Sequence, residues 1–239
     1  MQSISDVVQA STFIFSGTVL ELGASSVPFV PRNANLITAR LDASLRTDPV
    51  LGDLRGKTIT IAVGSAEQFT VGQQVVFFAN SWVHGRGIAV REVAHLDAGQ
   101  ADSVAAAVAQ LPQRHLLDRL QDAQVVVDAK IAKIDPPGFT LDQHDGLWAA
   151  AHLDVNSTLK GEAPQPAVFY FATAEWPPWN RVPRFEEGQS GIFTLHIPPP
   201  DTVKDGGTLP AGGLVVVDAA DFQDASEAPR IQQFLAVLK

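Results

Sequence analysis

The chain has 239 residues, a formal net charge of −9 and no cysteine. Its length allows one large domain or two of ordinary size, and 46% hydrophobic with 18% charged residues is typical of a globular protein with a sizeable core. The acidic balance argues against binding to nucleic acid or to an anionic membrane surface. The lack of cysteine excludes disulfides, thiolate nucleophiles and metal–thiolate sites.

The N-terminus carries no recognisable export signal. Residues 1–6 contain neither a basic region nor a long apolar run, so the sequence predicts no signal peptide. No apolar stretch approaches the ~18 residues of a membrane span. We therefore expect a cytoplasmic protein, with a periplasmic or secreted location as the alternative if a signal peptide has been trimmed.

The first half of the chain is predicted to contain a short helix, five strands and a second helix. Residues 4–10 suit a helix that Ser3 or Ser5 could cap. Alternating apolar residues predict strands at 12–22, 35–46, 57–63, 73–80 and 88–96. Residues 97–111 are rich in alanine and predict a helix, which Pro112 ends while starting the next one.

The second half repeats this order. Residues 118–127 align with 6–15 at an offset of 112, and 151–154 align with 39–42 at the same offset. Further predicted elements are a strand at 167–172, a last strand at 214–219 and a closing helix at 229–238. We interpret the chain as a duplication with domains at 1–111 and 112–239.

One short motif recurs in both halves. Phe69, Gly72, Gln73 and Phe77 have the same spacing as four residues located 116 positions later, Phe185, Gly188, Gln189 and Phe193. Each copy predicts a turn with a conformationally free glycine that leads into a core strand. Together with Gly17, which suggests a bulge in the first strand, this pattern predicts two tandem five-stranded barrels of the OB type with short flanking helices.

The short motifs also resemble one branch of that fold, the TIMP/netrin-like family. The resemblance rests on Gly17-Thr-Val19, on Leu159-Lys160-Gly161 and on the Phe-x-x-Gly-Gln motif, with 54–56 as a partial match to Leu-Lys-Gly in the first half. It implies a barrel and a habit of binding proteins. The inhibitors of that branch engage metalloproteases through an N-terminal cysteine, which this chain lacks, so that mechanism is not implied.

Candidate catalytic or metal-binding residues are few. The pairs His95/Asp97 and His152/Asp154 each place an imidazole and a carboxylate on one strand face, and Asp142 and His144 lie in a predicted loop. Solvated strand and turn positions explain all three groups more simply. No nucleophile elbow, phosphate loop or dinucleotide fingerprint is present in the sequence.

Aromatic residues in the predicted loops are the stronger candidates for a binding site. In OB barrels the loops between strands one and two and between strands four and five meet at one mouth, which holds the ligand. The candidate protein-binding residues in these and neighbouring loops are Phe29, Trp82, His84, Arg86, Phe139, Trp176 and Trp179. The alternative is that these rings seal the barrel ends.

We therefore expect a non-enzymatic protein-binding module or structural adaptor without a cofactor or metal. Its partner is expected to be another protein, with no nucleic acid or membrane partner. If Trp82 belongs to the binding site, Trp82→Ala is expected to weaken partner binding and to change the free energy of unfolding by less than ~1 kcal/mol. The alternative is a metal-dependent hydrolase that uses Asp142, His144, His152 and Asp154.

Overall fold

The computed structural model describes residues 3–83, 85, 87–140, 147–174, 182–198 and 212–238, with the side chains of 137–140 and 147 excepted. The chain is mainly β and divides into two compact units, residues 1–112 and 113–239. None of the helices within the described ranges is long and apolar enough to cross a bilayer.

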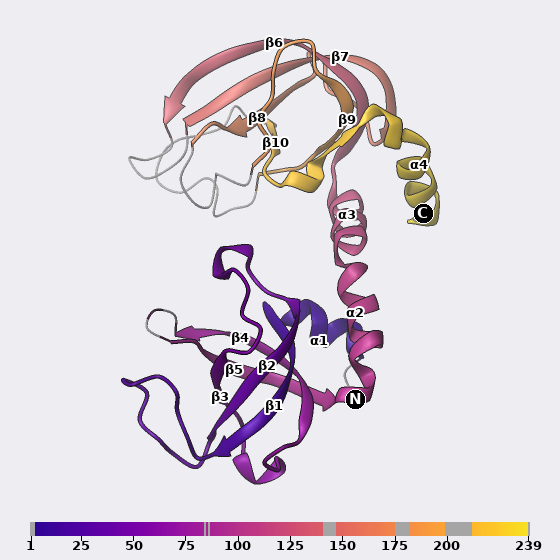
Figure 1. Cartoon of the computed structure of the whole chain (residues 1–239). Coiled ribbons are helices and arrows are strands. Elements are labelled where there is room, and N and C mark those ends of the chain that lie inside the picture. The colour runs from indigo at the N-terminus through magenta and orange to yellow at the C-terminus, as the bar shows by residue number, and fades with distance from the viewer. Residues whose placement is uncertain are drawn as a thin grey trace. The chain divides into compact units, whose positions relative to one another are not determined.

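The first unit is a closed five-stranded barrel with flanking helices (Figure 1). The strands are β1 (Phe13–Leu22), β2 (Leu36–Arg46), β3 (Thr58–Ala62), β4 (Gln74–Val83) and β5 (Ala89–Asp97). They follow one another around the barrel in the order β1-β2-β3-β5-β4, and β3 runs parallel to β5 while the other pairs are antiparallel. All five predicted strands of this unit are present within a few residues of their expected bounds.

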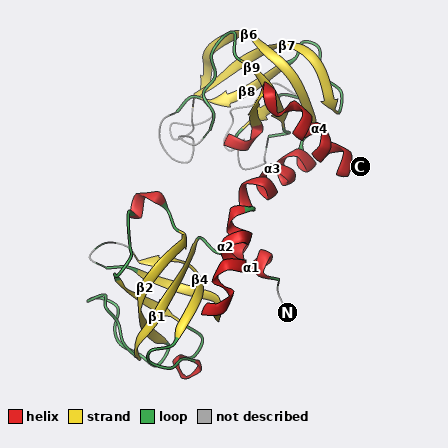
Figure 2. Ribbon diagram, turned by 45° about the vertical axis from the view of Figure 1, so that its right-hand side comes forward, coloured by secondary structure: helices red, strands yellow, loops and turns green. Residues whose placement is uncertain are grey.

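Helix α1 (Ile4–Ala10) precedes the barrel and packs beside α2 (Ala101–Ala109), which follows it (Figure 2). Ser3 is the N-cap of α1, because its hydroxyl accepts the Asp6 N–H while the Asp6 carboxylate accepts the Ser3 N–H. Three short 3-10 helices complete this unit: η1 (Pro49–Leu51), η2 (Ala66–Gln68) and η3 (Ala98–Gln100).

Aromatic rings fill the first barrel. Phe15 and Phe77 stack with ring centroids 5.2 Å apart, and both are fully buried. The predicted bulge is confirmed, since the pairing of β1 with β2 shifts between Ser16 and Gly17. A Cβ at Gly17 would lie 2.8 Å from the carbonyl oxygen of Arg40, so the bulge brings the two backbones too close for a side chain.

The second unit is a curled six-stranded sheet in the order β10-β8-β7-β6-β9-β11. Its elements are α3 (Leu111–Asp122), β6 (Val125–Thr140), β7 (Leu147–Lys160), β8 (Val168–Ala172), β9 (Ser190–Leu195), β10 (Leu214–Val216), η6 (Ala219–Asp221), β11 (Phe222–Asp224), η7 (Ala225–Glu227) and α4 (Ala228–Val237). A two-way backbone bridge between His196 and Val215 joins the end of β9 to β10.

The strand pairing of the first unit recurs in the second. Val127 pairs with Phe193 as Phe15 pairs with Phe77. β10 runs parallel to β8 as β5 does to β3, and β11 pairs with β9 as the end of β5 pairs with β4. β10 and β11 together thus occupy the place of β5.

The sequence-based prediction of one last strand at 214–219 is therefore wrong. The strand breaks after Val216, because Asp218 and Asp221 form a capping box that starts η6. Ten positions separate Leu214 from Asp224, whereas seven separate the corresponding Val90 and Asp97. The additional residues hold η6, and the chain then rejoins the sheet as β11.

The predicted correspondence between β2 and β7 is also wrong, by two residues. Thr18 pairs with Arg40 in the first unit, and the matching Lys130 pairs with Asp154 in the second. Arg40 therefore corresponds to Asp154 and not to His152. A shift of two residues leaves every side chain on the same face of its strand, so the apolar pattern alone cannot detect it.

The repeated Phe-x-x-Gly-Gln motif forms the same turn twice. Gly72 has φ 86° and Gly188 has φ 87°, so both occupy the left-handed region that favours glycine. The Oε1 atoms of Gln73 and Gln189 accept the backbone N–H groups of Thr70 and Glu186. The expected turn with a free glycine is confirmed, and the glutamine side chain fixes it.

A cation at the end of β2 or β7 caps the helix that precedes each sheet. Arg46 donates to the carbonyl oxygens of Val8 and Ser11 at 2.8 and 2.7 Å, and Lys160 donates to those of Leu120 and Gln121 at 2.8 and 2.7 Å. These bonds satisfy carbonyl groups that helix ends leave free. The first-unit counterpart of Leu159-Lys160-Gly161 is therefore residues 45–47, and the match to 54–56 is wrong.

Candidate functional site

The loop of residues 23–35 folds over one end of the first barrel. Its Ser26 backbone N–H donates to the Thr60 hydroxyl at 2.8 Å, and the two hydroxyl oxygens lie 2.9 Å apart. Val27 and Val30 are buried in one cluster with residues of β2, β4 and β5. Hydrogen bonds and apolar packing therefore both hold this loop in place.

Phe29 lies at the tip of this loop. The N–H of Val30 donates to the carbonyl of Val27 at 3.0 Å, which closes a tight turn with Pro28 and Phe29 in its centre. Proline suits the first central position because its ring fixes φ. The Phe29 ring is 59% exposed although both valines of the turn are buried. The sequence thus correctly placed Phe29 in a loop, and the structure leaves its ring accessible.

Trp82 has a different setting from the one expected. It lies in β4, not in a turn, and it packs against the cluster of Val27, Val30 and Ala89. The guanidinium of Arg91 lies 5.2 Å from its ring centroid, within the range of a cation–π contact. Trp82 therefore helps to seal this barrel end, and the expectation of an unchanged stability in Trp82→Ala is no longer supported.

The other predicted aromatic and basic side chains lie outside the described residues. Phe139 lies in β6, where its backbone pairs with Trp148, and not in the predicted loop. The side chain of Phe139 and the residues His84, Arg86, Trp176 and Trp179 lie outside the described part of the chain. Phe29 and Trp82 are thus the two candidates whose surroundings are known.

His152 is paired, but with a different carboxylate from the one proposed. Its Nε2 lies 2.6 Å from Oδ2 of Asp135 in β6, and Asp154 is exposed. His152 and Asp154 line a shallow groove with a volume of about 820 Å³ beside residues 161–167. Asp142 and His144, the other members of the proposed hydrolase site, lie outside the described residues.

Asp135 is a poor candidate for a general base. The hydrogen bond from Lys133 and, second to it, the hydrogen bond with His152 hold the pKa of the Asp135 carboxyl below its usual value. The hydrogen bond between Lys133 and Asp135 also raises the pKa of Lys133. A carboxylate that is stabilised in its charged form takes up a proton less readily. The two hydrogen bonds therefore weaken the basicity that catalysis would need.

His95 is likewise part of a local pair. Its Nδ1 lies 2.5 Å from Oε1 of Glu92, and its ring centroid lies 4.7 Å from that of Phe69. Asp97 lies at the N-cap position of η3. Across the described ranges, no three histidine, aspartate or glutamate side chains come close enough together to hold a metal ion.

A buried ionic network in the second unit was not predicted. The Asp221 carboxylate is fully buried and accepts two hydrogen bonds from Arg119 of α3, at 2.6 and 2.7 Å. It also accepts the backbone N–H groups of Val217 and Asp218 at 3.0 Å each, and His196 Nε2 lies 3.1 Å away. The network joins α3 to the point where the last strand breaks.

The partners of Asp221 determine its charge. Burial alone would raise the pKa of this carboxyl, but the hydrogen bonds from His196 and Arg119 and the charge of Arg119 outweigh burial and hold the pKa below its usual value. The Asp-x-x-Asp spacing of 218 and 221 was the one local signal in the sequence, since it is typical of a capping box. We interpret this network as a structural anchor, because the Asp221 carboxylate is fully buried and both of its oxygens accept hydrogen bonds from within the unit.

The chain matches no protein-family model, and no curated protein is similar to it in sequence.

Proposed function

We propose that the chain is a non-enzymatic protein-binding module or structural adaptor made of two OB-like barrels. The closed strand order and the parallel β3–β5 pair support this fold for the first unit. The repeated pairing register and the repeated Phe-x-x-Gly-Gln turn support a second copy of the same unit. The TIMP/netrin-like resemblance remains part of this proposal.

The observation that carries the proposal is the exposed Phe29 ring on a fixed turn. Binding costs less when the contacting residue is already held in place, because less conformational entropy is lost. Large aromatic side chains that enter a partner's pocket dominate many protein interfaces. A hydrogen bond to Thr60 and two buried valines hold the loop in place. The loop that carries Phe29 therefore needs no further ordering when a partner binds.

A protein partner fits the charge of the chain better than a nucleic acid does. OB barrels can bind oligonucleotides at this mouth, but such sites attract phosphates with clustered basic residues. The net charge here is −9, and the described arginines at this barrel end are engaged, Arg91 with the Trp82 ring and Arg32 with Glu21. We therefore propose a partner that offers an apolar pocket to Phe29.

Phe29→Ala is expected to weaken partner binding by about 30-fold or more, which corresponds to ~2 kcal/mol. Because the ring is exposed, its removal should change the free energy of unfolding by no more than ~0.5 kcal/mol. The measurement is affinity capture from the native host with wild-type and variant baits, followed by titration of the partner that is recovered.

Val50→Ala is the matched control. Val50 is 87% exposed and lies in η1 of the same unit, so this variant also removes an exposed apolar group. The proposal is supported by a partner that binds wild type and Val50→Ala with equal affinity but no longer binds Phe29→Ala. A partner that binds all three equally contradicts it.

Trp82→Ala is expected to lower the free energy of unfolding of the first unit by about 1–3 kcal/mol, because it removes a half-buried ring from the cluster at the barrel end. Chemical denaturation measures this loss. A change below ~0.5 kcal/mol would show that the ring does not contribute to packing.

Metal analysis of the purified protein separates the adaptor from the hydrolase alternative. A stoichiometric metal ion that is lost in His152→Ala would favour the hydrolase. Retention of partner binding after treatment with a chelator would favour the adaptor.

A further inference from the structure

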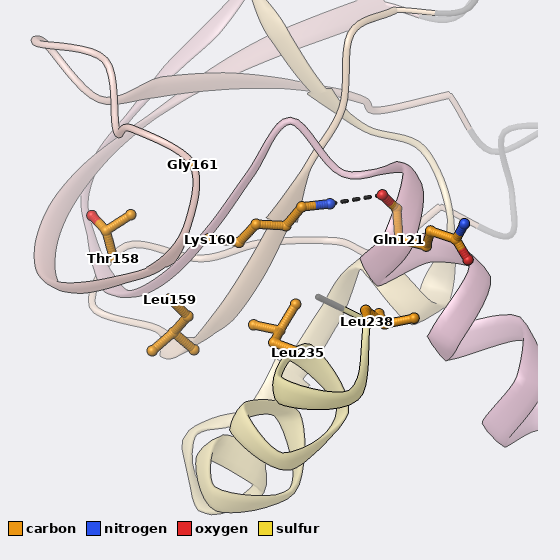
Figure 3. A pocket seen from close by; sticks show the side chains of 7 residues that line it. All are labelled: Gln121, Thr158, Leu159, Lys160, Gly161, Leu235 and Leu238. Carbon is orange, nitrogen blue, oxygen red and sulfur yellow. Dashed lines mark hydrogen bonds between the residues drawn. The ribbon is translucent and has the colours of Figure 1, made fainter.

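A small pocket lies in the second unit where the ends of α3, β7 and α4 meet (Figure 3). Its volume is about 330 Å³, at the lower end of the range of ligand pockets. The residues that line it are Gln121, Thr158, Leu159, Lys160, Gly161, Leu235 and Leu238. Three leucines thus share the pocket with one ammonium group.

The ammonium of Lys160 has no negatively charged partner within the described part of the chain. Its Nζ donates to the carbonyl oxygens of Leu120 and Gln121, and Figure 3 shows the side chain reaching toward Gln121. An ammonium group has three N–H donors, so one donor remains after these two bonds. Carbonyl oxygens do not neutralise the positive charge, and an anionic group at the pocket would do so.

The leucines supply an apolar wall beside this charge. Leu235 is buried, while Leu238 is 37% exposed and lies at the end of α4. In Figure 3, Leu235 and Leu238 come from the end of α4 and Leu159 comes from the end of β7. An apolar ligand would cover leucine surface that now contacts water.

The corresponding positions of the first unit differ from these at one place. Strand pairing and the matching helices place Leu45, Arg46, Val108 and Leu111 at the positions of Leu159, Lys160, Leu235 and Leu238. Leu45, Val108 and Leu111 pack into one cluster with α1. Leu159 and Leu235 likewise join one cluster with α3, so the units differ at Leu238, which lies outside that cluster.

The units also differ at one position of the helix that follows the last strand. Ala107 of α2 corresponds to Phe234 of α4, and each packs into the cluster under its helix. In the first unit α2 packs on α1, and the small Ala107 side chain lies in their shared cluster.

We propose that this pocket binds a small monocarboxylate with an apolar tail. The carboxylate accepts the remaining N–H of Lys160, and the tail lies against Leu159, Leu235 and Leu238. A charge-assisted hydrogen bond fixes the head group, and apolar burial supplies most of the affinity. This binding site is independent of the protein-binding role proposed for Phe29.

The test uses the full-length chain and octanoate as the probe, with calorimetry as the readout. We expect saturable binding at one site, with a Kd between millimolar and micromolar values for a ligand of this size. Octylamine, which has the same tail and the opposite charge, should bind at least tenfold more weakly. Equal binding of the two probes, or no saturable binding of octanoate, overturns the proposal.

Two variants locate the site. Lys160→Met keeps the apolar stem and removes the charge, and it should weaken octanoate binding at least tenfold. Arg46→Met is the matched control, because Arg46 also caps a helix but lies in the first unit, so its octanoate binding should remain at the wild-type value. If Lys160→Met and Arg46→Met both bind octanoate equally well, the proposal is overturned.

Leu238→Trp tests the pocket in a protein that still has Lys160 to cap α3. The indole ring would fill the pocket without removing Lys160, so octanoate binding should be lost while the circular dichroism spectrum stays unchanged. If Lys160→Met fails to fold, this variant decides alone. Full octanoate binding by a folded Leu238→Trp protein shows that the ligand lies elsewhere and that the proposal is wrong.

Discussion

Asp221→Asn is expected to lower the free energy of unfolding of the second unit by about 3–5 kcal/mol, because the substitution leaves Arg119 without its buried carboxylate partner. Asparagine has nearly the same shape, so the loss reports charge and hydrogen bonding more than packing. Arg119 spans from α3 to η6, and the same substitution should loosen the attachment of α3. Urea denaturation followed by circular dichroism measures the stability change.

Asp42→Asn is the matched control. Asp42 accepts hydrogen bonds from Thr18 and Arg40 at 2.6 and 2.8 Å, but the Arg40 side chain is half exposed. Ion pairs of this kind contribute no more than ~1 kcal/mol. Similar losses for Asp42→Asn and Asp221→Asn would show that burial does not strengthen the Asp221 network.

The Asp221 network also predicts a pH dependence. Because the folded protein holds the pKa of Asp221 below its unfolded value of ~3.9, the unfolded chain binds this proton more readily. The stabilisation is therefore complete above about pH 4 and is lost as the pH falls below that value. The stability difference between wild type and Asp221→Asn should be large at neutral pH and should narrow in acid, and a constant difference would contradict this assignment.

The sequence predicted the strands well because their signal is local. A strand with one buried face alternates apolar and polar residues, and each predicted strand of the first unit showed that alternation. The Phe-x-x-Gly-Gln turn was equally readable, since a glycine with positive φ and two core phenylalanines lie within nine residues. These features depend on neighbours in the chain, which a sequence displays directly.

The features that the sequence did not predict depend on distant residues. The β6–β7 pairing repeats the bulges of the β1–β2 pairing, so the two-residue slip arises in the longer connection between β6 and β7, and an alternating pattern does not reveal it. The partners Arg119 and Asp221 lie 102 positions apart. Only the folded chain brings them together.

The sequence predicted which aromatic residues lie at the candidate site, but it did not predict how exposed each of them is to solvent. Phe29 and Trp82 are both aromatic residues at one end of the barrel, yet the first is exposed and the second is half-buried. The difference arises from Val27 and Val30, which turn inward and leave the two central residues of the turn, Pro28 and Phe29, outside. Sequence patterns do not show which side of a short loop faces the core.

Gly161→Ala is expected to destabilise the second unit by about 2–5 kcal/mol, for two reasons that add. Gly161 has φ 70°, a conformation that costs other residues about 1–2 kcal/mol. A Cβ at this position would also lie 2.2 Å from the carbonyl oxygen of Gln124, and relieving such a contact costs roughly 1–3 kcal/mol more. Because Gln124 lies two residues after the end of α3, the backbone must shift close to the helix end that Lys160 caps.

Gly188→Ala separates the two contributions. Gly188 has φ 87°, but the nearest atom to a Cβ there is Cε of Lys130 at 4.0 Å, so only the backbone penalty of about 1–2 kcal/mol should appear. Urea denaturation of both variants gives the comparison. A larger loss for Gly161→Ala measures the close approach of β7 to the end of α3, whereas equal losses would mean that the chain relaxes around the new methyl group and that Gly161 is required for its φ angle alone.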